Sequence, residues 1–302
     1  MRHQFQLYAM LLCLGIVWGL NFSLIKFAAL SGLPFSTIAL LVILGNMIIF
    51  GAFSLILTGR LRLPFSRVAF FAGCGLLGYL LPFFLELFAV PKLGAGTLAL
   101  MVSLAPITTV LLAAAAGADK ITPRRAFGAI LGFCAIAPIA ISRIDELQSG
   151  FGLALLAGLA VPITYASYHV YISKFWPEGY EPFEVATGET IGAVAFMVPI
   201  YALSMGMDPI PDQPISTYWV IGELLSFSAL EVWLYFSLMR KGGPVFVAQT
   251  GYVSVTSGVI WGALLFGEAI SPWLLASVAI MITALILVAP GKTADEDETQ
   301  LA

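Results

Sequence analysis

Apolar residues dominate this chain in long runs, and charged, glycine-containing and proline-containing breaks separate the runs. A helix needs about 20 mostly apolar residues to cross the hydrocarbon of a bilayer, and ten runs approach that length. We predict spans with cores at 7–27, 35–58, 68–90, 94–117, 124–142, 150–173, 184–205, 217–238, 244–266 and 272–289. The pattern therefore predicts an all-α integral membrane protein with ten transmembrane helices.

The composition supports a membrane location and narrows the classes of partner. Of 302 residues, 60% are hydrophobic and only 10% are charged, whereas a soluble protein is roughly half apolar and a quarter charged. The net charge of -3 and the absence of a basic stripe argue against a nucleic-acid partner. The three cysteines lie inside apolar runs, so we expect no disulfide framework, no metal site and no cofactor.

The Lys and Arg residues predict the orientation of the chain, because cytoplasmic loops carry an excess of them. With ten spans, eleven of these residues fall on the side of the N-terminus and three on the other. The three are Lys26, Lys92 and Arg143. We therefore expect a multi-pass protein of the plasma (inner) membrane with both termini in the cytoplasm.

The two halves of the chain resemble each other. At an offset of 148 residues the segment 18–27 lies over 166–175, and at 149 residues 119–123 lies over 268–272. Five spans per half is an odd number, so the second half must enter the membrane from the opposite side. We predict inverted five-helix repeats at 1–145 and 146–290 around a central cavity, followed by an acidic disordered tail at 291–302.

Several motifs occur in the order typical of a known family. They are Trp18-Gly19-x-Asn21-Phe22 with Lys26, Phe83-Phe84 with Leu93-Gly94-Ala95-Gly96 and Leu104-x-Pro106, and Gly267-Glu268-x-x-Ser271. The chain resembles the EamA-type members of the drug/metabolite transporter superfamily. That resemblance implies a ten-helix basket whose spans one, three, four, six, eight and nine line the cavity. Its members move amino acids, metabolites or toxic organic compounds, most often outward.

Glu231 is the most informative single residue. It lies inside an apolar run, about 12 Å from the Arg240–Lys241 end at 1.5 Å per residue. A carboxyl near the middle of a membrane costs at least a few kcal/mol, so it should face a cavity or a partner. Substrate or proton binding and a structural hydrogen bond to another helix are both open interpretations.

His169 occupies the repeat position of Asn21 and is a second candidate for proton coupling, since an imidazole titrates near neutral pH. A neutral histidine that only hydrogen-bonds within the helix packing is the alternative. Glu86 is a third candidate, although Glu86, Glu189 and Glu223 lie nearer to span ends, where solvation or pairing explains them. Lys92 is a possible partner of Glu86.

Aromatic and polar residues of several spans are predicted to line a substrate site, because stacking and a few hydrogen bonds suit a small amphiphilic molecule. The same aromatics at helical spacing also fit ordinary core packing. The predicted substrate-binding residues are Trp18, Asn21, Tyr79, Phe83, Ser103, Tyr165, His169, Glu231, Trp233, Gln249 and Tyr252.

Four lysines lie at predicted helix ends: Lys26, Lys92, Lys174 and Lys241. Interfacial anchoring by snorkelling explains each of them, and a gating or substrate-attracting role is the alternative.

Glycines and prolines also carry information within the spans. Gly73-x-Gly75-x-x-Gly78 matches a dinucleotide-binding fingerprint, but inside a span it indicates close helix packing instead. Pro82, Pro106, Pro138, Pro162 and Pro199 predict kinks.

Together these features predict a secondary active transporter, with export as the expected direction, for small organic metabolites such as amino acids. The expected partners are the substrate, the lipid bilayer and protons, and the expected assembly is a monomer or weak homodimer. A facilitative exchanger is the main alternative. An intramembrane lipid-modifying enzyme fits less well because the chain has no HExxH and no GxSxG motif. A channel would need a re-entrant segment or an oligomeric pore.

Overall fold

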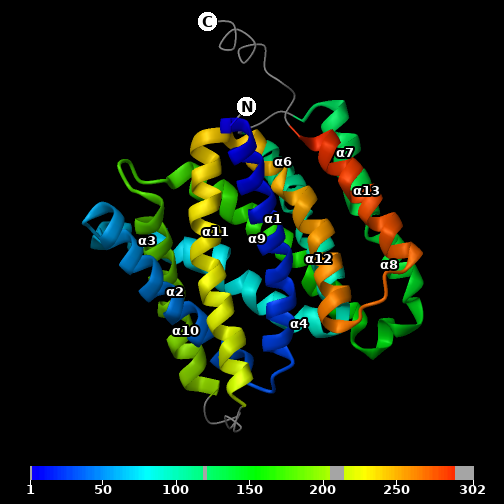
Figure 1. The fold of residues 1–302 in the computed structure, drawn as a ribbon, viewed down its shortest axis with the longest axis horizontal. Helices are drawn as coiled ribbons and strands as arrows, with labels where there is room; N and C mark the ends of the chain where they lie inside the picture. Colours follow the sequence, from blue (N-terminus) through cyan, green and yellow to red (C-terminus); the bar gives the residue numbers. More distant parts are fainter. Residues whose placement is uncertain (1, 118–120, 205–213, 290–302) are drawn as a thin grey trace, which may run out of the picture.

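A computed structural model describes residues 2–117, 121–204 and 214–289 of the chain, and every regular element in these ranges is helical (Figure 1). The predicted acidic tail and the repeat landmark at Asp119 lie outside the described residues. The first half comprises α1 (Arg2–Ala29), α2 (Phe35–Thr58), η1 (Phe65–Arg67), α3 (Val68–Cys74), η2 (Gly75–Leu80), α4 (Leu81–Leu93), α5 (Ala95–Val102), α6 (Ala105–Ala115), α7 (Pro123–Cys134) and α8 (Ala137–Ser142).

The second half has fewer interruptions. It comprises η3 (Ile144–Ser149), α9 (Phe151–Phe175), α10 (Pro182–Ser204), α11 (Ile215–Ala248), α12 (Thr250–Phe266) and α13 (Pro272–Val288). Eight stretches are long and apolar enough to cross a membrane, and α12 and α13 are shorter apolar helices. The described residues therefore contain ten apolar helical segments, which fits the predicted ten spans.

The predicted break at Lys241–Pro244 is wrong. Helix α11 continues through it to Ala248, and the next helix begins at Thr250. A proline is tolerated within a membrane helix where the freed backbone groups find other partners. The proline signal therefore misplaces the start of the ninth span by six residues (250 against 244).

The predicted proline kinks divide into two groups. Pro82, Pro106 and Pro138 each stand at the first turn of a new helix, after the π-helical turn η2, the α5–α6 break and the α7–α8 break respectively. This placement is favourable because the first turn needs no amide donor from those residues. Pro162 and Pro199 instead lie inside the uninterrupted helices α9 and α10.

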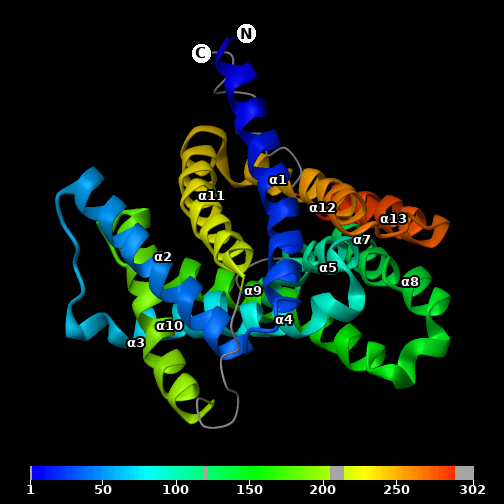
Figure 2. The ribbon, with the colours of Figure 1, turned by 60° about the horizontal axis from the view of Figure 1, so that its bottom comes forward.

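Helix contacts follow the two-fold relation that the repeat predicts. Helix α1 packs on α11 and α12, and its repeat mate α9 packs on α4 and α6. Helix α2 packs on α10, and α7 packs on α13, so each of these helices contacts its own repeat mate. In Figures 1 and 2, α2, α3 and α10 gather at one end, α7, α8 and α13 at the other, and α1, α4, α9 and α11 lie between them.

The glycine fingerprint marks a close helix contact, as predicted. A Cβ atom on Gly75 would lie 2.3 Å from the backbone nitrogen of Ala193 and 2.4 Å from the carbonyl oxygen of Glu189 in α10. Gly73 and Gly78 face the rings of Tyr171 and Tyr168 in the same way. The π-helical turn η2 therefore packs directly on α10 and α9, which sets the position of the side chains around it.

The outer surface of the bundle is strongly apolar. Ile56 and Leu203, for example, are 78% and 79% exposed. Exposed side chains of this kind are satisfied when lipid tails surround the bundle.

We predict that Gly75→Ala destabilises the protein, because the new methyl group would meet the backbone of α10, which cannot rotate away. Overpacking of this kind typically costs about 1–3 kcal/mol. The matched control is Gly222→Ala in α11, where a Cβ meets nothing within 4 Å. Thermal unfolding in detergent should show a lower midpoint for Gly75→Ala and an unchanged or slightly higher midpoint for Gly222→Ala. Equal midpoints for the two variants would contradict the close contact.

Candidate functional site

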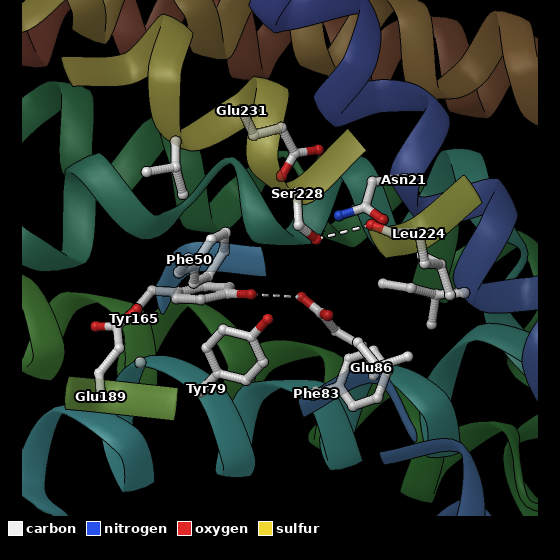
Figure 3. Close-up of a pocket in the computed structure, with 14 residues that line it drawn as sticks. Asn21, Phe50, Tyr79, Phe83, Glu86, Tyr165, Glu189, Leu224, Ser228 and Glu231 are labelled. Carbon is white, nitrogen blue, oxygen red and sulfur yellow. Dashed lines mark hydrogen bonds between the residues drawn. The ribbon is translucent and has the colours of Figure 1, made fainter. Parts of the chain in front are cut away.

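A cavity of about 160 Å³ lies in the middle of the bundle, between the two repeats (Figure 3). Helices α1, α2, α4, α9, α10 and α11 and the turn η2 supply its walls. The lining residues are Asn21, Ile25, Val42, Phe50, Gly78, Tyr79, Phe83, Glu86, Tyr165, Glu189, Leu224, Ser228, Glu231 and Val232. The cavity thus combines an apolar and aromatic wall with three carboxyl groups.

Helical spacing places several of these side chains on one face. Tyr79, Phe83 and Glu86 are separated by four and three residues, and Leu224, Ser228 and Glu231 repeat the same spacing on α11. Residues three and four apart lie on the same side of a helix. The continuous η2–α4 segment and α11 therefore each turn one stripe of side chains toward the cavity.

Two of the three carboxyls have tyrosine partners on α9. Glu86, which is 2% exposed, accepts a hydrogen bond of 3.1 Å from the hydroxyl of Tyr165. Glu189 on α10 accepts a hydrogen bond of 2.7 Å from the hydroxyl of Tyr168. Helix α9 therefore bridges α4 and α10 through two hydroxyl–carboxyl contacts, and Figure 3 shows the one between Tyr165 and Glu86.

The third carboxyl is without a partner. Oε1 of Glu231 is buried and has no hydrogen-bond partner in the described part of the chain, and the same holds for Oδ1 of Asn21. Both residues line the cavity. Buried polar groups are normally hydrogen-bonded, so these two acceptors lack a donor in this conformation.

Asn46 holds the neighbouring hydroxyl groups in place. This fully buried residue of α2 donates through Nδ2 to the hydroxyl of Tyr79 and, at 3.3 Å, to Oγ of Ser228. The contacts tie α2 to η2 and α11 at the cavity wall. Asn46 is thus a positioning residue that sequence reasoning missed, since a single amide in an apolar run has no distinguishing spacing.

The cavity brings together about half of the predicted substrate-binding residues. Asn21, Tyr79, Phe83, Tyr165 and Glu231 line it, as does the proton-coupling candidate Glu86. Glu86 has Tyr165 as its hydrogen-bond partner, so the suggested pairing with Lys92 is not the contact that the structure has.

The other predicted residues lie away from the cavity lining. Trp18 packs on Tyr235 with ring centroids 6.2 Å apart, and the Ser103 hydroxyl donates to the carbonyl of Ala99 at 2.8 Å. Nδ1 of His169 lies 3.3 Å from the Thr109 hydroxyl, which is the packing interpretation of this histidine. Trp233 is 50% exposed on α11. Gln249 and Tyr252 are half-buried at the start of α12.

The set of lining helices also differs from the expectation. Spans two and seven supply Val42, Phe50 and Glu189, whereas spans four and nine supply none of the lining residues. The expectation that spans four and nine line this cavity is therefore wrong. Helices α5 and α12 pack against each other and against α1 instead, and this contact keeps them outside the lining.

A charged cluster, here called the latch, joins three helix ends. Its members are Lys26, Glu268 and the amides of Ala95 and Gly96. Nζ of Lys26 donates to Glu268 Oε1 at 2.6 Å, and the two amides donate to the same carboxylate at 2.7 and 3.1 Å. The carboxylate thereby caps the N-terminus of α5, where the helix dipole favours negative charge. The latch fastens α1 and α5 to the α12–α13 connection.

Glycines give the latch carboxylate its space. Gly94 adopts a φ of +89° before α5, and a Cβ on Gly262 would lie 2.5 Å from Glu268 Oε2. Lys26 also lies over the ring of Phe266, 4.2 Å from its centroid. The three other predicted helix-end lysines, Lys92, Lys174 and Lys241, are exposed.

Comparison with known proteins agrees with this architecture. The model of the EamA-like transporter family matches the chain twice, at residues 6–141 and 152–289. A crystal structure of another protein superposes with a TM-score of 0.63 at 18% identity, covering 94% of this chain and 96% of that chain, which supports the fold. No curated protein matches the sequence. The two family matches cover most of this multi-pass membrane protein, and the chain belongs to the EamA-like transporter family.

Proposed function

We propose that the protein is a secondary active transporter that exports a small organic solute across the plasma (inner) membrane by alternating access. The observation that carries the proposal is the central cavity between the repeats, which holds a carboxyl without a partner. Two similar bundles in opposite orientation have two nearly equivalent packings, each opening the shared cavity to a different side. A monomer suffices in this proposal, because one chain supplies every wall of the cavity.

The latch supports a conformation closed to the outside. If the N-terminus is cytoplasmic, the end of α1, the start of α5 and the α12–α13 connection all lie on the outer face. The latch then fastens these ends together above the cavity. Its repeat mate at the inner end would pair Lys174 with Asp119, which lies outside the described residues.

Glu231 is the proposed coupling residue. A buried carboxyl can hold either a proton or a solute group, and exclusive occupancy couples the two fluxes. The titratable groups around it are the Glu86–Tyr165 pair, the Glu189–Tyr168 pair and Tyr79. His169 is a weaker candidate for this role, because its ring contacts Thr109 and it is not among the cavity-lining residues.

We predict that Glu231→Gln abolishes accumulation of solute against its gradient, while solute exchange persists at saturating solute concentration, because the amide keeps the size and polarity of the side chain but cannot release a proton. The measurement is uphill uptake and exchange in proteoliposomes with an imposed pH gradient. Glu223→Gln is the matched control, since Glu223 lies on the same helix but is exposed. If Glu231→Gln still accumulates solute uphill, Glu231 is not the coupling residue. Wild-type protein that only equilibrates its solute would favour the facilitative exchanger.

We also predict that Glu268→Gln opens the outer face more often. The change weakens a charge-assisted interaction by roughly 1.4 kcal/mol, which corresponds to about a tenfold change in the population of the open state. A cysteine at Ile25, on α1 in the cavity wall, should then react about tenfold faster with a membrane-impermeant maleimide added outside. The background replaces the native Cys13, Cys74 and Cys134.

The control for the latch is a second ion pair on the same predicted face. Arg143 donates to Glu146 in an exposed contact between the repeats. Glu146→Gln should leave the labelling rate at Ile25→Cys unchanged. Equal rates in the Glu268→Gln and Glu146→Gln backgrounds would contradict a gating role for the latch.

A further inference from the structure

The charge of the cavity lining is one-sided. Three carboxyl groups, those of Glu86, Glu189 and Glu231, line the cavity, and no Lys, Arg or His is among its lining residues in the described ranges. Glu86 and Glu189 each accept a hydrogen bond from a tyrosine hydroxyl, whereas Oε1 of Glu231 accepts none. When Glu231 is ionised, a solute that neutralises it must bring positive charge with it.

The unpartnered atoms in the cavity are acceptors. Oε1 of Glu231 and Oδ1 of Asn21 are both buried without a donor, and both side chains belong to the cavity lining (Figure 3). They come from α11 and α1, so one ligand group between them would join the two repeats. A protonated primary amine offers three N–H donors and no acceptor, which complements this pair of acceptors.

The rest of the wall suits the body of such a solute. The rings of Phe50, Tyr79, Phe83 and Tyr165 surround the same cavity. Aromatic faces attract cations electrostatically and pack well on apolar groups. The volume of about 160 Å³ is close to that of an apolar cavity of about 150 Å³ known to hold benzene. One aromatic ring with a short chain is therefore the size that fits.

An amino acid fits this lining less well. Its ammonium group finds Glu231 and Asn21, but its carboxylate finds no cationic side chain among the lining residues and three carboxyls nearby. An uncompensated charge in a low-dielectric site is costly, and like charges add to that cost. Only hydroxyl and amide groups remain to receive the solute carboxylate.

We infer that the solute of the proposed transporter is a small organic cation, a protonated amine on an apolar body of about one aromatic ring, and not a zwitterionic amino acid. The inference rests on the proposed function and narrows it to one substrate class. In this arrangement the ammonium group binds between Glu231 and Asn21, and the ring lies against the aromatic wall. Exit of the cation leaves the Glu231 carboxylate free to take a proton for the return step.

The test uses three matched probes on the purified full-length protein in detergent, by isothermal titration calorimetry. Phenethylamine carries the cation, 2-phenylethanol replaces it with a neutral hydroxyl, and phenylalanine adds a carboxylate. We expect phenethylamine to bind at least about tenfold more tightly than either of the others, since a buried ion pair and a cation–π contact are lost in the alcohol. Glu231→Gln should weaken phenethylamine binding about tenfold and leave 2-phenylethanol binding unchanged.

Glu223→Gln, on an exposed position of α11, is the control variant and should bind all three probes as the native protein does. Phenylalanine binding as tightly as phenethylamine would overturn the inference, as would a Glu231→Gln variant with unchanged amine affinity or a folded protein that binds no phenethylamine. Different results would contradict the substrate class and the carrier function. Transport of amino acids without transport of amines contradicts only the substrate class, whereas amine binding without any transport contradicts the carrier.

Discussion

A buried carboxyl in a membrane span must find a partner, and this constraint organises the centre of the molecule. Lipid provides no hydrogen bonds, so ionisable groups in spans turn toward other helices or toward a cavity. Glu86 and Glu189 find tyrosine hydroxyls on α9, while Glu231 faces the cavity with one oxygen unpartnered. The cavity lining therefore combines carboxyl groups with apolar and aromatic side chains, and in this account the solute binds at Glu231.

The repeated fold explains how one cavity can serve two faces of the membrane. The helices that line the cavity belong to both repeats: α1, α2 and α4 to the first, and α9, α10 and α11 to the second. When the two repeats move relative to each other, Glu231 stays in place on α11 while the first-repeat helices that face it change position. The latch acts at the ends of the helices. There, Lys26, Glu268 and the start of α5 hold together the face of the bundle that is predicted to lie outside. Close glycine contacts such as that of Gly75 with α10 hold the two repeats against each other.

The sequence predicts the spans and part of the site for physical reasons that can be identified. Span number follows from the length of apolar runs, because the bilayer thickness is fixed. Glu231 stands out because a carboxyl is costly in the middle of a span, and the repeat and the family resemblance point to Asn21. The sequence predicts Glu189 near the membrane boundary of its span. Its place in the cavity lining depends on how α10 packs on η2, which the sequence does not show. Phe50 and Asn46 have no sequence signal, and neither does the pairing of Lys26 with Glu268, which is 242 residues away.

The central claim is that a solute occupies the cavity and is carried between the two faces, and counterflow tests it most directly. Proteoliposomes are loaded with a high concentration of unlabelled phenethylamine and diluted into a trace of the labelled compound. The account predicts a transient, saturable accumulation of label inside above the outside concentration, because a carrier that returns loaded exchanges one molecule for another. Uptake that rises only to the outside concentration, with no overshoot for this or any other solute tested, would contradict it.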